Sequence, residues 1–141
     1  DTALNIALDY AHERKMFGGT QLELEGIRWM LGDIANDLEI SRLLYKKAAG
    51  LVGTEEGALA AAHAKLYVPD AALRAANTCT QVLGGAGLLK SNGLDRLSRL
   101  AQMLKIVDGT TEIQRVVIGR SLAKQAAERA DARSTARENA A

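Results

Sequence analysis

The near absence of proline constrains this chain more than any other feature. Its 141 residues include a single proline, Pro69, and no segment alternates apolar and polar residues as a half-buried strand does. Residue types that favour helices, chiefly Ala, Leu, Lys, Arg and Glu, are abundant. We therefore predict an all-α fold, an antiparallel bundle of four to five helices.

Apolar spacing and capping residues predict the helix boundaries. The expected helices cover about residues 2–15, 21–50, 55–82, 94–106 and 111–126. Thr20 and Thr54 are the expected N-caps of the second and third helices, and Pro69 is expected to kink the third. Residues 1–126 thus form the predicted bundle. The polar residues 127–141 lack an apolar stripe, so we expect a frayed helix or a disordered tail there.

Several side chains are expected to lie inside the bundle. Tyr45 belongs to an apolar stripe on the second helix, and Trp29 on the same helix is expected to pack rather than to bind a ligand. The one cysteine, Cys79, lies in a stretch rich in Ala, Val and Leu, which favours an inert buried thiol. A single cysteine cannot form an internal disulfide, so we expect a reducing, cytoplasmic location.

Composition argues against several classes of function. The formal net charge of +1 gives no broad field that would attract nucleic acid or an anionic membrane. No apolar run reaches the ~20 residues that a membrane-spanning helix needs. His12 and His63 lack the spacing of metal ligands, so we expect no metal site. Because a helical pattern is already running at Asp1, we expect a piece of a longer protein.

Three short segments carry the candidate site residues. Asp108–Gly109–Thr110 puts a carboxylate on a glycine turn before an amphipathic helix, which can aim a carboxylate and a backbone N–H at one point. The other two are Arg14-x-x-Phe17-Gly18 and Gln81-x-x-Gly84-Gly85-x-Gly87. Taken alone, each also fits ordinary structure: a capped Asp–Gly turn, a helix-terminal arginine with a core phenylalanine, and a helix C-cap.

In this order and at these spacings, the three segments resemble the C-terminal helical domain of acyl-CoA dehydrogenases, from about residue 2 to residue 125. The resemblance implies an FAD-dependent enzyme that desaturates an acyl-CoA thioester between its α and β carbons. It implies electron transfer to an electron-transfer flavoprotein. It also implies a homo- or hetero-oligomer, a dimer of dimers joined through the helical domain. As one domain of that enzyme, the isolated chain is expected to be inactive.

The resemblance also assigns roles to single residues. Asp108 stands where the family usually has a glutamate, the catalytic base that removes the α proton of the substrate. Gly109 and Arg120 are implied to contact the acyl-CoA. Contacts with FAD, several of them to the FAD of a neighbouring subunit, are implied for Arg14, Phe17, Gln81, Gly84, Gly85, Thr110 and Glu112.

Departures from the family pattern leave alternatives open. Aspartate is one methylene shorter than glutamate, so Asp108 is a slow base, a base for a deeper-lying substrate, or a relic; some family members hold the base upstream. Residues 99–102 read Arg-Leu-Ala-Gln where Arg-Asp-Ala-Lys is common, and Val107 replaces an aromatic residue. The changes fit an unusual acyl group, or a degenerate assembly module of a heteromeric dehydrogenase. An unrelated helical bundle is the third alternative.

Overall fold

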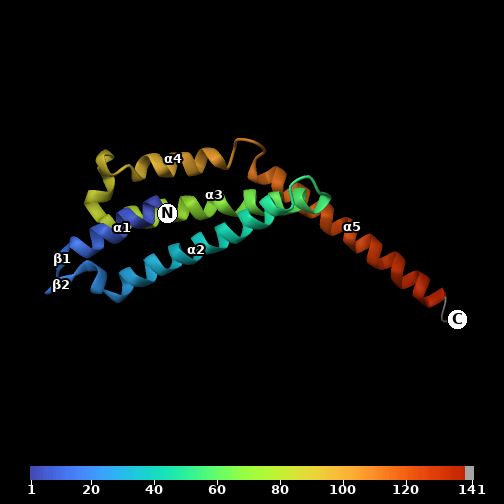
Figure 1. The fold of residues 1–141 in the computed structure, drawn as a ribbon, viewed down its shortest axis with the longest axis horizontal. Helices are drawn as coiled ribbons and strands as arrows, with labels where there is room; N and C mark the ends of the chain where they lie inside the picture. The colour runs from blue at the N-terminus through green and yellow to red at the C-terminus, as the bar shows by residue number, and fades with distance from the viewer. Residues whose placement is uncertain (139–141) are drawn as a thin grey trace.

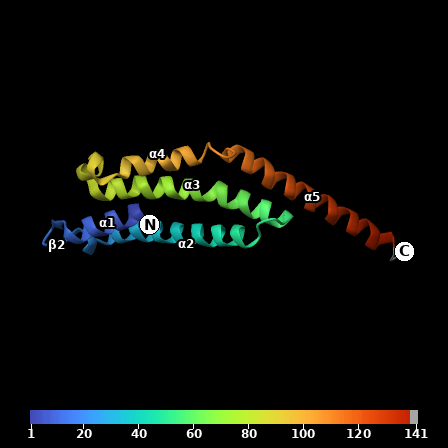
Figure 2. The ribbon, with the colours of Figure 1, turned by 45° about the horizontal axis from the view of Figure 1, so that its top comes forward.

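The computed structural model describes residues 1–138, which fold almost wholly into helices. The long helices are α1 (Thr2–Glu13), α2 (Glu25–Gly50), α3 (Glu55–Leu83), α4 (Leu94–Leu104) and α5 (Thr111–Glu138). Short 3-10 helices cover Gln21–Glu23, Gly84–Leu88 and Lys90–Asn92. The prediction of an all-α antiparallel bundle is confirmed: α2 and α4 run antiparallel to α3, and α5 leads away from the other helices (Figures 1 and 2).

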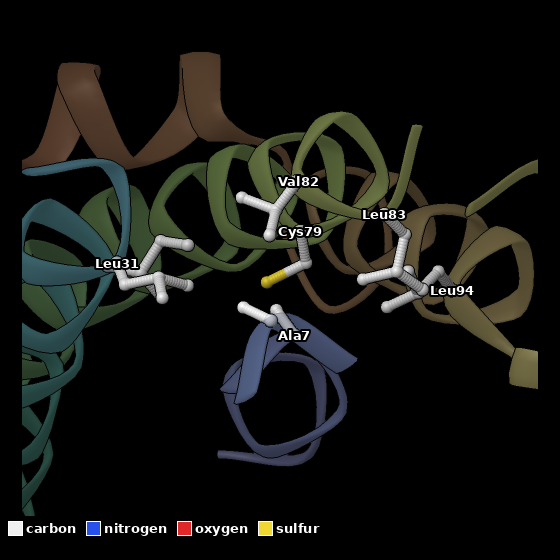
Figure 3. Close-up of a cluster of buried hydrophobic side chains, with 8 residues drawn as sticks. Ala7, Leu31, Cys79, Val82, Leu83 and Leu94 are labelled. Atoms are coloured by element: carbon white, nitrogen blue, oxygen red, sulfur yellow. The ribbon is translucent and has the colours of Figure 1, made fainter. Parts of the chain in front are cut away.

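The core lies where α1, α2 and α4 pack around the C-terminal half of α3. Figure 3 shows its side chains converging from these four helices. The buried cluster consists of Ala7, Ala11, Leu31, Ile34, Cys79, Val82, Leu83 and Leu94. Cys79 is fully buried, and its burial raises the pKa of the thiol to about 11. The prediction of an inert, packed thiol is therefore confirmed.

A small β-hairpin joins α1 to α2, where the sequence predicted only a helix end. The helix stops at Glu13, and Lys15–Met16 (β1) pairs with Gly19–Thr20 (β2) as two antiparallel strands. Phe17 and Gly18 form the turn between them with positive φ angles of 51° and 88°, the geometry that suits a two-residue hairpin turn. The strands are too short to show the alternation by which a strand is recognised.

Thr20 and Thr54 both cap helices, though not in the same way. The Thr54 side chain accepts a hydrogen bond from the Gly57 N–H at 2.9 Å, which confirms it as the N-cap of α3. Thr20 instead begins the short 3-10 helix, and its N–H and hydroxyl both donate to the Glu23 carboxylate at 3.1 Å. These bonds, the backbone one first, lower the pKa of Glu23. The second long helix therefore starts later than predicted, at Glu25.

Three further predictions are corrected by the structure. Trp29 and Tyr45, expected to be packed, are 66% and 69% exposed on α2. The prediction was wrong because helical spacing identifies an apolar face but not whether another helix packs against it. The helix α4 ends at Leu104, two residues before the predicted end. The last helix runs to Glu138 instead of ending near residue 126, since its Ala, Arg and Glu residues favour helix even without an apolar face. Residues 139–141 of the predicted tail lie outside the described residues.

No helix within residues 1–138 combines the length and the apolar character that crossing a bilayer demands. Pro69 lies buried inside α3, and the helix continues on both sides of it.

Candidate functional site

The predicted site residues fall into two groups. The first group surrounds the end of the molecule where the hairpin meets the C-terminus of α3 (Figure 1). There, Arg14, Gln81, Gly84 and Gly85 line one open hollow of about 400 Å³. Two of the predicted motifs, far apart in the chain, thus form a single surface.

The glycines shape this hollow. Gly84 ends α3 with a φ of 58°, a conformation that a side chain disfavours. A Cβ at either Gly84 or Gly85 would meet no atom within 4 Å, so the backbone there faces open space. At Gly87 the reason for glycine differs, because a Cβ would lie 2.4 Å from the carbonyl oxygen of Thr80.

Gln21 also lines the hollow, and the sequence analysis missed it. Its side-chain amide donates a hydrogen bond to the Val82 carbonyl at 2.7 Å, which ties the hairpin to the last turn of α3. The residue is only 7% exposed, and its Oε1 has no hydrogen-bond partner among the described residues. No local pattern reveals such a residue, since its partner lies 61 positions away in the chain.

This hollow suits the polar parts of a dinucleotide cofactor. The exposed Arg14 offers a planar fork of donors for phosphate oxygens. The open glycine backbone allows close approach of a ligand. Phe17 lies outside the lining, at the hairpin tip, and is 90% exposed, so it is not a core residue of this chain.

The second group lies on the connection between α4 and α5. Asp108 is exposed there with a φ of 55°, and Gly109 follows with a φ of 92°. Among the non-glycine residues that the structure describes, Phe17 and Asp108 are those with positive φ. Both were predicted as site residues from motifs, without reference to backbone geometry. Residues held in such strained conformations cluster at functional sites.

The start of α5 holds the turn in place. The Thr110 hydroxyl accepts from the Ile113 N–H at 3.4 Å, and the Gln114 side chain donates to the Gly109 carbonyl at 3.3 Å. The carboxylate of Glu112 accepts from the Thr111 hydroxyl at 3.1 Å. Its own backbone N–H, then the Thr110 and Thr111 hydroxyls, lower the pKa of Glu112. These contacts make Glu112 a stabiliser of the helix start, whatever else it binds.

Within one chain the two groups do not meet. The hairpin lies at one end of the bundle, while the Asp108 turn lies toward the other end, at the start of the projecting α5 (Figures 1 and 2). Arg120 is exposed on α5, twelve residues after Asp108 in the sequence. In residues 1–138 no three His, Cys, Asp or Glu side chains gather in a way that could hold a metal ion.

Comparison with known proteins decides the family. Residues 1–123 match the family model described as "Acyl-CoA dehydrogenase, C-terminal domain", a range that includes both groups. The chain belongs to the acyl-CoA dehydrogenase family. This membership excludes an unrelated helical bundle and does not favour a non-catalytic assembly module.

Individual relatives agree with this placement. The probable acyl-CoA dehydrogenase YngJ of Bacillus subtilis is 40% identical over 127 residues, which cover 86% of this chain and 32% of that protein. Butyryl-CoA dehydrogenase from Megasphaera elsdenii is 32% identical, with a TM-score of 0.81 over 86% of this chain and 32% of its own. The FAD complex of PigA is 27% identical, also with a TM-score of 0.81, over 86% of this chain and 32% of its own. The chain therefore spans about a third of the length of these relatives.

Proposed function

We propose that the full-length protein is an FAD-dependent acyl-CoA dehydrogenase that forms a double bond between the α and β carbons of an acyl-CoA thioester. The chain described here supplies the catalytic base and part of the FAD site. The observation that supports this most is the backbone of Asp108, strained at a φ of 55° in the turn that opens α5. Because an ordinary Asp–Gly turn can adopt the same conformation, the support comes from finding it inside the range that matches the family's C-terminal domain.

In this function Asp108 accepts the α proton of the thioester, and the backbone N–H of the same residue donates to the thioester carbonyl. The hydrogen bond stabilises the negative charge that develops on the carbonyl oxygen as the proton leaves. In the same proposal Gly109 and Arg120 contact the acyl-CoA, and Arg120 can pair with an anionic group of its CoA portion. Val107 precedes the base and leaves more room than an aromatic side chain.

The FAD contacts divide between the two groups of residues. Arg14, Phe17, Gln81, Gly84 and Gly85 contact the FAD of a neighbouring subunit, and Thr110 and Glu112 contact FAD from the Asp108 side. Bound FAD supplies the acceptor for the hydride that leaves the β carbon. The FAD complex of the related PigA supports this cofactor, as does the hollow with its exposed Arg14 and open glycine backbone.

The partners follow from the same assignment. An electron-transfer flavoprotein reoxidises the flavin, and the enzyme assembles as a dimer of dimers, homomeric or heteromeric, through its helical domain. The wide separation of the hairpin hollow from the Asp108 turn supports an oligomer, because a neighbouring subunit can bring its FAD to the hollow. The buried, free Cys79 fits a cytoplasmic enzyme.

Anaerobic titration of the purified full-length protein with a panel of acyl-CoA thioesters tests this function. One class of thioester is expected to bleach the visible flavin band, and Asp108→Asn is expected to slow the bleaching by at least about 100-fold while FAD stays bound. A protein that binds no FAD, or a flavin that no thioester bleaches even with its partner subunits present, would contradict the proposed activity. Bleaching at the wild-type rate in Asp108→Asn would place the base elsewhere.

A further inference from the structure

Two lysine side chains, one from α3 and one from the end of α4, connect the segment before Asp108 to α3. The ammonium group of Lys105 pairs with the Asp70 carboxylate at 2.6 Å, and both side chains are about two-thirds shielded, at 27% and 32% exposure. The ammonium group of Lys65 donates to the carbonyl of Leu104, the last residue of α4. Both contacts fall within four residues of Asp108, and both lead to the same helix.

Lys105 also closes the turn through its backbone. Its carbonyl accepts the N–H of Thr111 at 3.1 Å, which joins the end of α4 to the first residue of α5. Thr111 is only 4% exposed, so this bond is shielded from water. One residue thus links α3 through its side chain and α5 through its backbone. Asp108 is exposed on the loop between these two anchor points.

Other contacts of the turn do not replace this anchor. The Gln114–Gly109 hydrogen bond is long, at 3.3 Å, and it joins the turn only to its own helix. The ion pair between Lys124 and Glu55, at 3.0 Å, does link α5 to α3, but it is exposed and lies sixteen residues beyond Asp108. The helices α4 and α5 also pack against α3, but the lysine contacts at residues 104 and 105 are the described polar contacts to α3 that lie next to the turn.

We infer that the Lys105–Asp70 ion pair is a positioning device that fixes where the Asp108 carboxylate points. This inference rests on the proposed role of Asp108 as the base. An aspartate reaches one methylene less far than a glutamate, so it has less room to correct a displaced backbone. A misplacement of about 1 Å can cost an enzyme ~100-fold in rate. Lys105 and Asp70 touch no substrate; they act through the backbone that carries Asp108.

The test uses the full-length enzyme and the thioester that bleaches its flavin. Lys105→Met and Asp70→Asn are each expected to slow flavin reduction about 10- to 100-fold at saturating thioester, with FAD content and thioester affinity unchanged. The double variant should be no slower than the slower single variant, since both remove the same pair. Lys105→Arg should restore most of the rate. Deuterium at the α carbon should slow the variants more than the wild type, because proton removal has become the limiting step.

Lys124→Met is the matched control, because it removes a lysine–carboxylate ion pair that also reaches α3, but from α5 and away from the turn. It should leave the rate and the isotope effect unchanged. Asp70→Asn, nearly isosteric, answers the question if Lys105→Met does not fold. Unchanged rates in both variants, with Asp108→Asn inactive, would overturn the positioning role and leave the proposed base intact. Normal reduction in Asp108→Asn would overturn both.

Discussion

The hairpin end and the Asp108 turn each contain one non-glycine residue with a positive φ angle, yet different interactions stabilise the two regions. At the hairpin end, a buried neutral hydrogen bond from Gln21 to the Val82 carbonyl joins the segments over an apolar core (Figure 3). At the turn, partly exposed lysine contacts tie the loop to α3. A buried neutral bond is little affected by salt, whereas a partly exposed ion pair is screened by it.

This difference suits what each region is proposed to do. A cofactor site that receives a neighbour's FAD needs a fixed surface, and the hollow is built on the core of the bundle. A base that must meet a substrate needs exact placement of one carboxylate, and charged contacts at the foot of a short loop provide it. The two regions should therefore fail in different ways when they are altered.

The largest effect expected is that a variant in one region changes only the rate of flavin reduction, while a variant in the other changes only FAD affinity. Asp108→Asn should slow flavin reduction by about 100- to 10,000-fold, the usual contribution of a general base, and should leave FAD affinity unchanged. Arg14→Ala should weaken FAD binding by about 10- to 100-fold, through the loss of charge-assisted hydrogen bonds. Its FAD-saturated form should still be reduced at the normal rate. Stopped-flow reduction and FAD titration of the apoenzyme measure both.

Lys15→Ala is the control for Arg14→Ala, because it removes a neighbouring exposed cation that lies outside the lining of the hollow. Equal losses of FAD affinity in the two variants would show a general charge effect. A slow reduction in FAD-saturated Arg14→Ala would show that the two regions are not separate.

Features set by local residues could be predicted from the sequence. The Thr54 cap and the glycine break after α3 depend on neighbours a few positions away, and both were found. The Asp108 turn was found because an aspartate and a glycine before a helix form a local signal. The hairpin was missed because it depends on Phe17 in a left-handed conformation, which the propensity of phenylalanine does not suggest.

Features that join distant segments could not be predicted. Nothing near Gln21 indicates a bond to Val82, and nothing near Lys105 indicates a pair with Asp70, because helix packing decides which residues meet. The same holds for exposure. The apolar spacing that includes Tyr45 identifies one face of α2, but it does not show whether another helix packs against that face. The roles of the site residues themselves remain predictions from the family resemblance.

Alkaline pH should weaken the core beneath the hairpin end. The pKa of the buried Cys79 thiol is about 11, above its ordinary value of 9.0. The unfolded chain therefore loses the thiol proton first, and stability falls as pH rises from about 9 to about 11. Two pKa units correspond to roughly 3 kcal/mol. Urea unfolding across this range should show that loss in the wild type.

Cys79→Ala isolates this contribution, because every other titrating group is kept. The free energy of unfolding of the variant should be lower at neutral pH, from the small cavity, but should fall less between pH 9 and pH 11. Parallel pH profiles for the two proteins would show that the thiol titrates normally and would contradict its burial.

The smallest effect expected is a difference in how the two regions respond to salt. Gln21→Leu loses the bond to the Val82 carbonyl but also removes the buried Oε1 that has no partner, so the net change in unfolding free energy should be about 1 kcal/mol or less. Raising the salt from about 0.1 M to about 1 M should leave that change as it is, since no charge is involved. The rate loss in Lys105→Met should shrink over the same range, because salt already weakens the wild-type pair. Urea unfolding of Gln21→Leu and flavin reduction by Lys105→Met, each at both salt concentrations, measure these two effects. If the stability change in Gln21→Leu depended on salt as strongly as the rate loss in Lys105→Met, the distinction between the two regions would be lost.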